Sequence, residues 1–308
     1  MIKDTLPDKL VERLGDEHIA IFLFHGVIKK QIHPVRNYTC KHIESELFAR
    51  CVQRLNAEGT SLTMDQVLQY TQNKSVIPKN AFAITFDDGF ENNLSIAAPI
   101  LYAENVSATI YITTSFVDNN CMSWIDLIEH AVEVTTLKNY QAHWSNINFD
   151  LSTTEKRIDF LKEVRRYAKG SSVCSPIQFA DLLCHELGVE KAPESLDPLD
   201  KKLTWEQIRS MNYNDLISFG GHSHTHPILS YLSEHELRRE VSISLDLLKT
   251  KGHIAPTHYS YPEGQEYCYS DQVISVLKEN GVECCPTAID GVNTTSVDPF
   301  HLKRILVA

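Results

Sequence analysis

Short apolar segments alternate with helix-like segments along most of the chain, and this alternation constrains the fold more than any other feature. The segments 20–25 (AIFLFH) and 81–86 (AFAITF) are short apolar runs of the kind that form buried strands. Between them, 41–59 carries apolar residues at helical spacing and ends in a glycine. Strands separated by helices predict a parallel sheet with helices outside it. The pattern favours a barrel over an open sheet only slightly.

The same patterns predict the remaining elements. We expect strands at 20–25, 81–86, 107–112, 216–220, 257–261, 282–286 and 302–307. We expect helices at 41–59, 63–70, 93–104, 204–211, 233–250 and 270–280. Thr63 is the expected cap of the second helix. The stretch of about 118–203 is polar and mainly helical, with NINFDL as its one candidate strand. We interpret it as an insertion into a single domain of residues 1–308, with a separate small domain as the alternative.

The composition narrows the classes of function. The chain has 29 basic and 40 acidic side chains and a formal charge of −11, so attraction to nucleic acid phosphates or anionic lipid is disfavoured. The N-terminus lacks the apolar core of a signal peptide, and there is no uncharged run of membrane-spanning length, which predicts a cytoplasmic protein. Eight cysteines lie without CxxC spacing, so we expect reduced thiols rather than disulfides or a cysteine zinc site.

Two adjacent aspartates, Asp87 and Asp88, end the expected strand 81–86 in the sequence TFDDG. Mutual repulsion raises the pKa of one carboxyl group unless a cation or an opposite charge relieves it. The pair therefore needs a positively charged partner.

Three histidines in five residues follow the expected strand 216–220, in the sequence HSHTH. A bend at Gly220 and Gly221 would aim His222 and His226 at a common point. One carboxylate and two neutral imidazoles suit a divalent metal ion and leave coordination positions for water and substrate. We therefore expect one aspartate to be a metal ligand and the other to be free as a base. We expect His224 to be structural, because a third ligand at this spacing would crowd the ion.

The motifs TFDDG (85–89) and HSHTH (222–226), in this order, resemble the first two motifs of the polysaccharide deacetylases of carbohydrate esterase family 4, the NodB homology domain. The resemblance extends from about residue 19 to the C-terminus, apart from the insertion. It implies a distorted (β/α) barrel with fewer than eight strands, with the site at the carboxyl ends of the strands. It also implies Asp87 as the general base, and Asp88, His222 and His226 as ligands of a divalent ion. Zinc is the leading candidate, with cobalt, nickel, iron and manganese as alternatives.

The third family motif, Arg-x-Pro-Tyr-Gly, is matched in part by SYPEG (260–264). The resemblance implies that the backbone N–H of Glu263 helps to bind the oxyanion, which does not depend on the side chain. Ser260 stands where the family has the arginine that orients the base. Arg304, in LKRI, is our candidate to replace it, with a surface arginine as the alternative.

The last family motif, Leu-x-His, is absent from the C-terminal LKRILVA but occurs at 23–27 (LFHGV). Some exopolysaccharide deacetylases of this family have their motifs permuted in this way. The first and last strands of a closed barrel are neighbours, so His25 would occupy the same place. His25 is therefore the expected general acid, with a histidine that only caps a strand as the alternative.

The predicted function is metal-dependent removal of an N-acetyl group from an amino sugar, in a glycan or in a sugar-nucleotide or lipid-linked precursor. The same site would support a deformylase or a deacetylase of another amide. A non-haem iron oxygenase and a glycan-binding relative without activity are further alternatives. Trp124 and Asp126 could line a sugar platform, although a tryptophan in a helical pattern usually lies in the core. The oligomeric state stays open.

Overall fold

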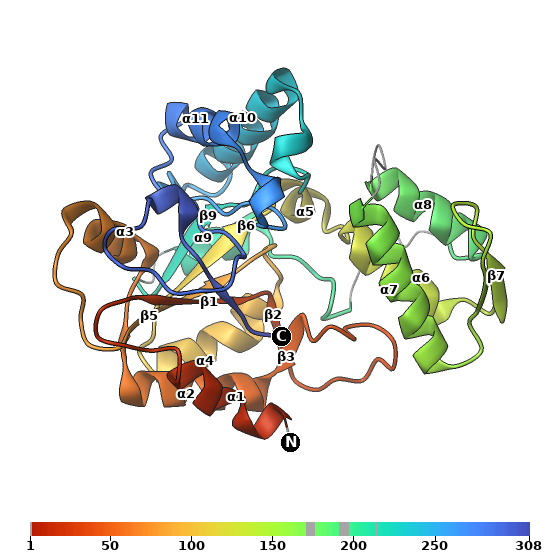
Figure 1. Cartoon of the computed structure of the whole chain (residues 1–308), viewed down its shortest axis with the longest axis horizontal. Helices are drawn as coiled ribbons and strands as arrows, with labels where there is room; N and C mark the ends of the chain where they lie inside the picture. The colour runs from red at the N-terminus through yellow and green to blue at the C-terminus, as the bar shows by residue number, and fades with distance from the viewer. Residues whose placement is uncertain (1, 171–175, 191–196, 213–214) are drawn as a thin grey trace.

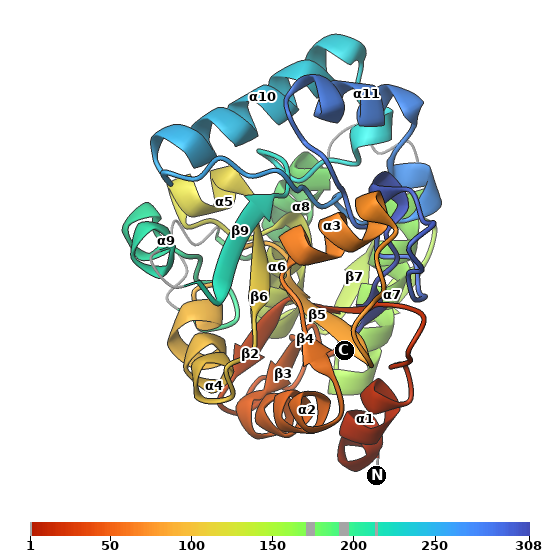
Figure 2. The ribbon, with the colours of Figure 1, turned by 90° about the vertical axis from the view of Figure 1, so that its left-hand side faces the viewer.

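A six-stranded parallel sheet forms the centre of the protein, with the strand order β10–β1–β5–β6–β9 and β4 beside β5 (Figures 1 and 2). The computed structural model describes residues 2–170, 176–190, 197–212 and 215–308. The strands are β1 (Ala20–Phe24), β4 (Thr60–Ser61), β5 (Ala81–Phe86), β6 (Ala108–Ile112), β9 (Ile217–Gly221) and β10 (Ile305–Leu306). Strands β1, β5 and β6 are buried along their whole length, as their mainly apolar sequences predict.

The hydrogen-bonded pairing of strands that would close the sheet into a barrel is interrupted between β9 and β10. Three isolated parallel bridges join the segments there, namely Gly221–Tyr259, His258–Cys284 and Pro286–Leu302. The strands expected at 257–261 and 282–286 are therefore wrong as continuous strands, and the last one is limited to β10. Prolines at 256, 262 and 286 have no N–H to donate to a ladder, which explains the interruption. These bridges make the barrel distorted.

Helices cover the outside of the sheet, as expected (Figure 2). They are α2 (Ser45–Glu58), α3 (Met64–Asn73), α4 (Ala98–Ala103), α5 (Thr114–Asn119), α9 (Trp205–Met211), α10 (Glu234–Thr250) and α11 (Asp271–Glu279). Thr63 forms a capping box with Gln66 at the start of α3, which confirms the predicted cap. The helix expected at 41–59 begins later, because His42–Glu44 forms β3 and pairs with β2 (Gly26–Ile28). The sequence patterns predicted neither α5 nor a further helix, α1 (Ile2–Val11), which packs on α2.

The insertion has a hydrophobic cluster of its own. It contains α6 (Trp124–Val134), the hairpin β7 (Asn139–Gln141) and β8 (Asn148–Asp150), α7 (Thr154–Gly170) and α8 (Pro176–Glu186). The candidate strand NINFDL contributes β8. Ile128, Leu161 and Leu183 are buried in this cluster, together with Val35 from the first part of the chain. Figure 1 shows these helices beside the sheet rather than over it.

The cysteines of the described residues are thiols, and most of them are buried. Burial raises the pKa of Cys51 to about 12, which makes that thiol unreactive. Cys174 lies outside the described residues. None of the helices in the described ranges is long and apolar enough to cross a membrane.

Aromatic packing links the first strands to α2. The ring of Phe48 lies 5.3 Å from that of Phe24 and 5.8 Å from that of Phe86, and all three side chains are buried. We predict that Phe48→Ala lowers the free energy of unfolding by about 3–5 kcal/mol, because the substitution removes a buried ring and leaves a cavity that the neighbouring side chains fill only in part. Urea denaturation measures this loss. A loss below about 1 kcal/mol would show that these rings do not hold α2 to the sheet.

Candidate active site

Polar side chains gather where parallel strands end at one edge of the sheet. Phe24 of β1 is paired in register with Phe86 of β5, so His25 and Asp87 follow neighbouring strand ends. The N–H of Asp87 donates to the carbonyl oxygen of Phe24 at 3.1 Å. His222 follows β9, and its N–H donates to Ile112 at the end of β6 at 2.9 Å. The alternation of strands and helices thus brings residues that are far apart in sequence to one place.

Asp88, His222 and His226 form a cluster whose ligand atoms all lie within 4.8 Å of one another. The Nε2 atoms of His226 and His222 lie 3.4 and 3.7 Å from Oδ1 of Asp88. Nδ1 of His222 is 2.8 Å from the carbonyl oxygen of Ser260, so it carries the proton and leaves the Nε2 lone pair facing the cluster. The structure therefore brings together the three residues predicted as metal ligands.

The donor set fits a divalent cation. Oδ1 of Asp88 is buried and has no hydrogen-bond partner among the residues that the structure describes, although it faces two imidazoles. Burial alone would raise the pKa of Asp88, but the ammonium group of Lys41 is the largest opposing cause, and the pKa is held well below its usual range. Burial lowers the pKa of His226, which keeps this imidazole neutral. An ionised carboxylate beside neutral imidazoles is the donor set that zinc and similar ions prefer.

The backbone around this cluster is strained. Asp88 and His226 have φ angles of 74° and 62°, in the left-handed region that costs non-glycine residues about 1–3 kcal/mol each. The bend expected at Gly220 and Gly221 is wrong in position, since the chain turns at Ser223 (φ 66°) and His226. The two glycines are needed for a different reason. A Cβ at Gly221 would lie 2.3 Å from the ring of Tyr259.

Arg304 holds Asp87 in a bidentate ion pair. Its Nη1 and Nη2 atoms each lie 2.8 Å from one carboxylate oxygen of Asp87. Nη2 also donates to Oγ of Ser260 at 2.8 Å, and Nε donates to the carbonyl oxygen of Thr287 at 2.6 Å. Arg304 is 1% exposed, so the alternative of a surface arginine is wrong. Burial alone would raise the pKa of Asp87, but the guanidinium outweighs it and lowers the pKa.

His25 lies at the end of β1 and lines the same pocket as Asp87 and Asp88. Its Nδ1 atom is buried and has no hydrogen-bond partner within the described part of the chain. Burial lowers the pKa of His25 to about 4, although Asp88 and Asp87 act in the opposite direction. The imidazole is therefore neutral near pH 7. It can donate a proton only after it has taken one up.

Glu263 also reaches this pocket. It follows Pro262 in a tight turn, with φ angles of 60° at Glu263 and 62° at Gly264. A side chain at Gly264 would collide with the backbone nitrogen of Ala288 at 2.5 Å, so the glycine of the motif is required here. The turn brings the predicted oxyanion-binding residue into the same pocket as Asp88, His222 and His226.

The pocket has a volume of about 350 Å³ and is lined in part by the insertion. Ser123, Trp124, Ile125 and Arg165 contribute to its wall, whereas Asp126 lies buried beneath it. His224 is outside the cluster, with Nδ1 2.9 Å from Oγ1 of Thr114. Trp124 also packs against the hydrophobic cluster of the insertion, as Trp144 does, and Trp205 packs against that of the sheet.

Lys41 is a site residue that the sequence patterns did not predict. Its Nζ atom lies 3.0 Å from Oδ2 of Asp88, and it lines the pocket. The residue stands in an irregular loop just before β3, in a stretch where the expected element was a helix. No spacing rule links it to the aspartate pair.

A family model described as polysaccharide deacetylase matches residues 74–285, about two thirds of the chain. The chain belongs to the polysaccharide deacetylase family. The chain is also similar to solved structures over nearly its whole length. A search of curated proteins found no similar sequence.

Three of the solved structures show how far the fold is shared. Deacetylase PplD from Streptococcus pyogenes, in complex with acetate, has a TM-score of 0.61 and 17% identity, over 94% of this chain and 92% of that one. IcaB from Ammonifex degensii has a TM-score of 0.61 and 15% identity, over 96% and 94%. A de-N-acetylase from Aggregatibacter actinomycetemcomitans has a TM-score of 0.60 and 15% identity, over 94% and 95%. These likenesses confirm the predicted distorted (β/α) barrel.

The ion pair between Arg304 and Asp87 gives a testable stability effect. We predict that Arg304→Met lowers the free energy of unfolding by about 3–5 kcal/mol at pH 7, because it leaves a buried carboxylate without its partner. Urea denaturation of metal-free protein measures the loss. The double variant Asp87→Asn/Arg304→Met should recover part of it. A double variant that is no more stable than Arg304→Met would contradict this explanation.

The same variant should change the dependence of stability on pH. In the wild type, the lowered pKa of Asp87 stabilises the fold above the unfolded value near 4, and this contribution disappears as the pH falls through the folded value. In Arg304→Met the pKa of the unpaired, buried carboxyl group rises instead. The difference in the free energy of unfolding between wild type and Arg304→Met should therefore become smaller as the pH falls from 7 to 5. A constant difference would mean that Asp87 is not the group affected.

Proposed function

We propose that this polysaccharide deacetylase uses a divalent metal ion to remove an N-acetyl group from an amino sugar in a glycan or glycan precursor. The observation that carries the proposal is that two adjacent aspartates lie in one pocket but have different surroundings. Asp88 faces two imidazoles with an oxygen that has no hydrogen-bond partner in the described ranges, whereas Asp87 is fixed by Arg304 beside it. One carboxylate is placed to hold a cation, and the other is kept ionised and oriented to accept a proton.

Asp88, His222 and His226 would hold the ion. When bound, a divalent ion polarises a carbonyl group and lowers the pKa of a coordinated water, which overcomes the poor reactivity of an amide toward water. Zinc is the first candidate for this donor set, and cobalt, nickel, iron and manganese are alternatives.

The remaining residues divide the proton transfers between them. Asp87 accepts a proton from the attacking water, and the bidentate contact with Arg304 fixes the direction of its lone pairs. The backbone N–H of Glu263 stabilises the negative charge that develops on the acetyl oxygen. His25 is neutral near pH 7, so it must first be protonated. Asp87 passes on to it the proton taken from the attacking water, and His25 delivers that proton to the amine nitrogen as the C–N bond breaks.

Two observations support a sugar as the substrate. The pocket of about 350 Å³ is of a size that accepts small ligands, and Trp124 offers an aromatic surface on which a sugar ring can stack. PplD was solved in complex with acetate, the product of N-acetyl hydrolysis, and another structural neighbour is a de-N-acetylase. The family and the parallel α/β fold also argue against the oxygenase alternative.

The proposal is tested with purified, remetallated protein and oligomers of N-acetylglucosamine or N-formylglucosamine. We expect release of acetate. If the protein releases formate from the formylated substrate but no acetate from the acetylated one, then it is a deformylase and the proposal is wrong. A protein that binds the acetylated oligomer but releases neither product would be the inactive glycan-binding relative.

Variants of the two proton-transferring residues separate chemistry from metal binding. We predict that Asp87→Asn and His25→Ala each lower kcat by about 10²–10⁴ while metal content stays near that of wild type. Asp290→Asn, which changes an exposed carboxylate on the surface, serves as the matched control and should keep full activity. Unchanged kcat in both site variants would refute their assigned roles.

Metal removal provides an independent check. We predict that chelation abolishes acetate release and that readdition of zinc or another divalent ion restores it, because the amide is unreactive without the ion. Elemental analysis of the treated protein must show that the ion has been removed. Full activity of such metal-free protein would overturn the metal-dependent mechanism.

A further inference from the structure

Lys41 connects the metal cluster to the insertion. Its ammonium group lies 3.0 Å from Oδ2 of Asp88 and 3.4 Å from Oδ1 of Asp126 on α6. The Lys41 side chain is 16% exposed, and its Nζ atom also lies 4.8 Å from the centre of the Phe90 ring. One cation therefore bridges a carboxylate of the barrel and a carboxylate of the insertion.

Two glutamates of α6 fasten the loop that precedes Lys41. Oε2 of Glu133 accepts hydrogen bonds from the backbone N–H groups of Val35 and Arg36, each at 3.0 Å. Glu129 accepts one from the N–H of Asn37 at 2.9 Å.

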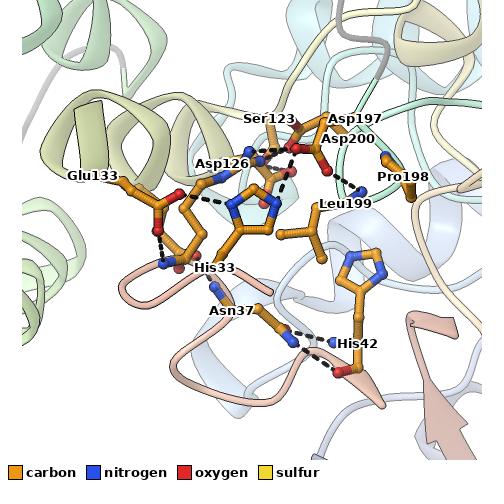
Figure 3. Close-up of polar contacts among 12 residues, drawn as sticks. His33, Asn37, His42, Ser123, Asp126, Glu133, Asp197, Pro198, Leu199 and Asp200 are labelled. Atoms are coloured by element: carbon orange, nitrogen blue, oxygen red, sulfur yellow. Dashed lines mark hydrogen bonds and ion pairs between the residues drawn. The ribbon is translucent and has the colours of Figure 1, made fainter. Parts of the chain in front are cut away.

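Further contacts tie the two ends of this loop (Figure 3). His33 lies between Glu133 and Asp197, with Nδ1 and Nε2 at 2.7 and 3.0 Å from their carboxylates. The Asn37 amide exchanges two hydrogen bonds of 2.8 Å with the backbone of His42, the residue after Lys41. The loop that carries Lys41 is therefore anchored on both sides of the lysine.

Asp126 is itself held in place. Oγ of Ser123 donates to its Oδ2 atom at 2.7 Å, and Nζ of Lys202 lies 3.8 Å from the same oxygen. The Lys202 side chain is fully buried, with Nζ 3.4 Å from the centre of the Phe90 ring. Carboxylates and ammonium groups thus alternate from Asp88 through Lys41 and Asp126 to Lys202, and each buried charge has a neighbour of opposite sign.

We propose that Lys41 is a positioning residue of the metal centre, which holds Oδ2 of Asp88 so that only Oδ1 is offered to the ion, and that α6 fixes Lys41 through Asp126. The proposal rests on the metal centre proposed above. Partners in the outer shell of a metal site orient the ligands, and their loss typically weakens metal binding by about 10–100-fold. The insertion would then contribute to the metal centre as well as to the pocket wall.

A competing interpretation predicts the opposite change in metal affinity when Lys41 is removed. If the ammonium group only occupies Asp88 in place of a metal ion, then removing it would free the carboxylate and remove a nearby positive charge. Metal binding would become tighter, not weaker. The sign of the change in affinity therefore separates a positioning lysine from a competing one.

The test is the zinc dissociation constant of the full-length protein, measured by competition with a chromophoric chelator. We expect Lys41→Met to bind zinc about 10–100-fold more weakly than wild type. Lys41→Arg, which keeps the charge and can reach both carboxylates, should recover most of the affinity. Lys41→Gln keeps a donor for Asp88 and provides a second comparison if Lys41→Met does not fold.

A double-mutant cycle tests the role of α6. Asp126→Asn should weaken zinc binding, but it should have little further effect in the Lys41→Met background, because Asp126 acts through the lysine. The matched control is Lys156→Met, which removes a lysine paired with Asp150 on the surface of the insertion and should leave the affinity unchanged.

Two results would overturn the inference. A Lys41→Met protein that binds zinc as tightly as wild type, or more tightly, would exclude a positioning role while leaving the proposed function intact. A wild-type protein that binds no divalent ion would overturn the proposed function and this inference together.

Discussion

The rest of this structure depends on how the charges of two buried carboxylates at the end of β5 are compensated. Asp87 and Asp88 are adjacent and both nearly fully buried, so neither could remain ionised without a cation of its own. The chain solves this with two separate cations. Arg304 pairs with Asp87 through its Nη1 and Nη2 atoms, and Lys41 pairs with Oδ2 of Asp88. This separation gives two chemically identical side chains different roles.

The sequence predicted those parts of the protein that depend on local pattern. Strands such as β5 and capped helices such as α3 follow from apolar spacing and from Thr63, and the motif residues mark the strand ends. Arg304 could be proposed only because the family arginine is missing at Ser260. Lys41 could not be found, because its contact with Asp88 depends on a loop whose path is set by hydrogen bonds to the distant α6.

The strands expected at 257–261 and 282–286 show the limit of the same reasoning. In the described structure, each is joined to its neighbours only by isolated bridges, since nearby prolines interrupt the ladder. The irregular backbone that follows 257–261 contains the SYPEG turn, which lies at the same pocket as Asp88, His222 and His226. The carbonyl oxygen of Ser260 can then fix His222, and Glu263 can reach the pocket.

The pairing of Arg304 with Asp87 also has a consequence for how the protein folds. The two residues are 217 positions apart, and β1, β5 and β6 can assemble before β10 reaches β1. Until β10 docks, Asp87 must stay hydrated or protonated, so this edge of the sheet remains open to water. Contacts between residues so far apart in sequence slow folding. Docking of β10 on β1 therefore also brings Arg304 to Asp87.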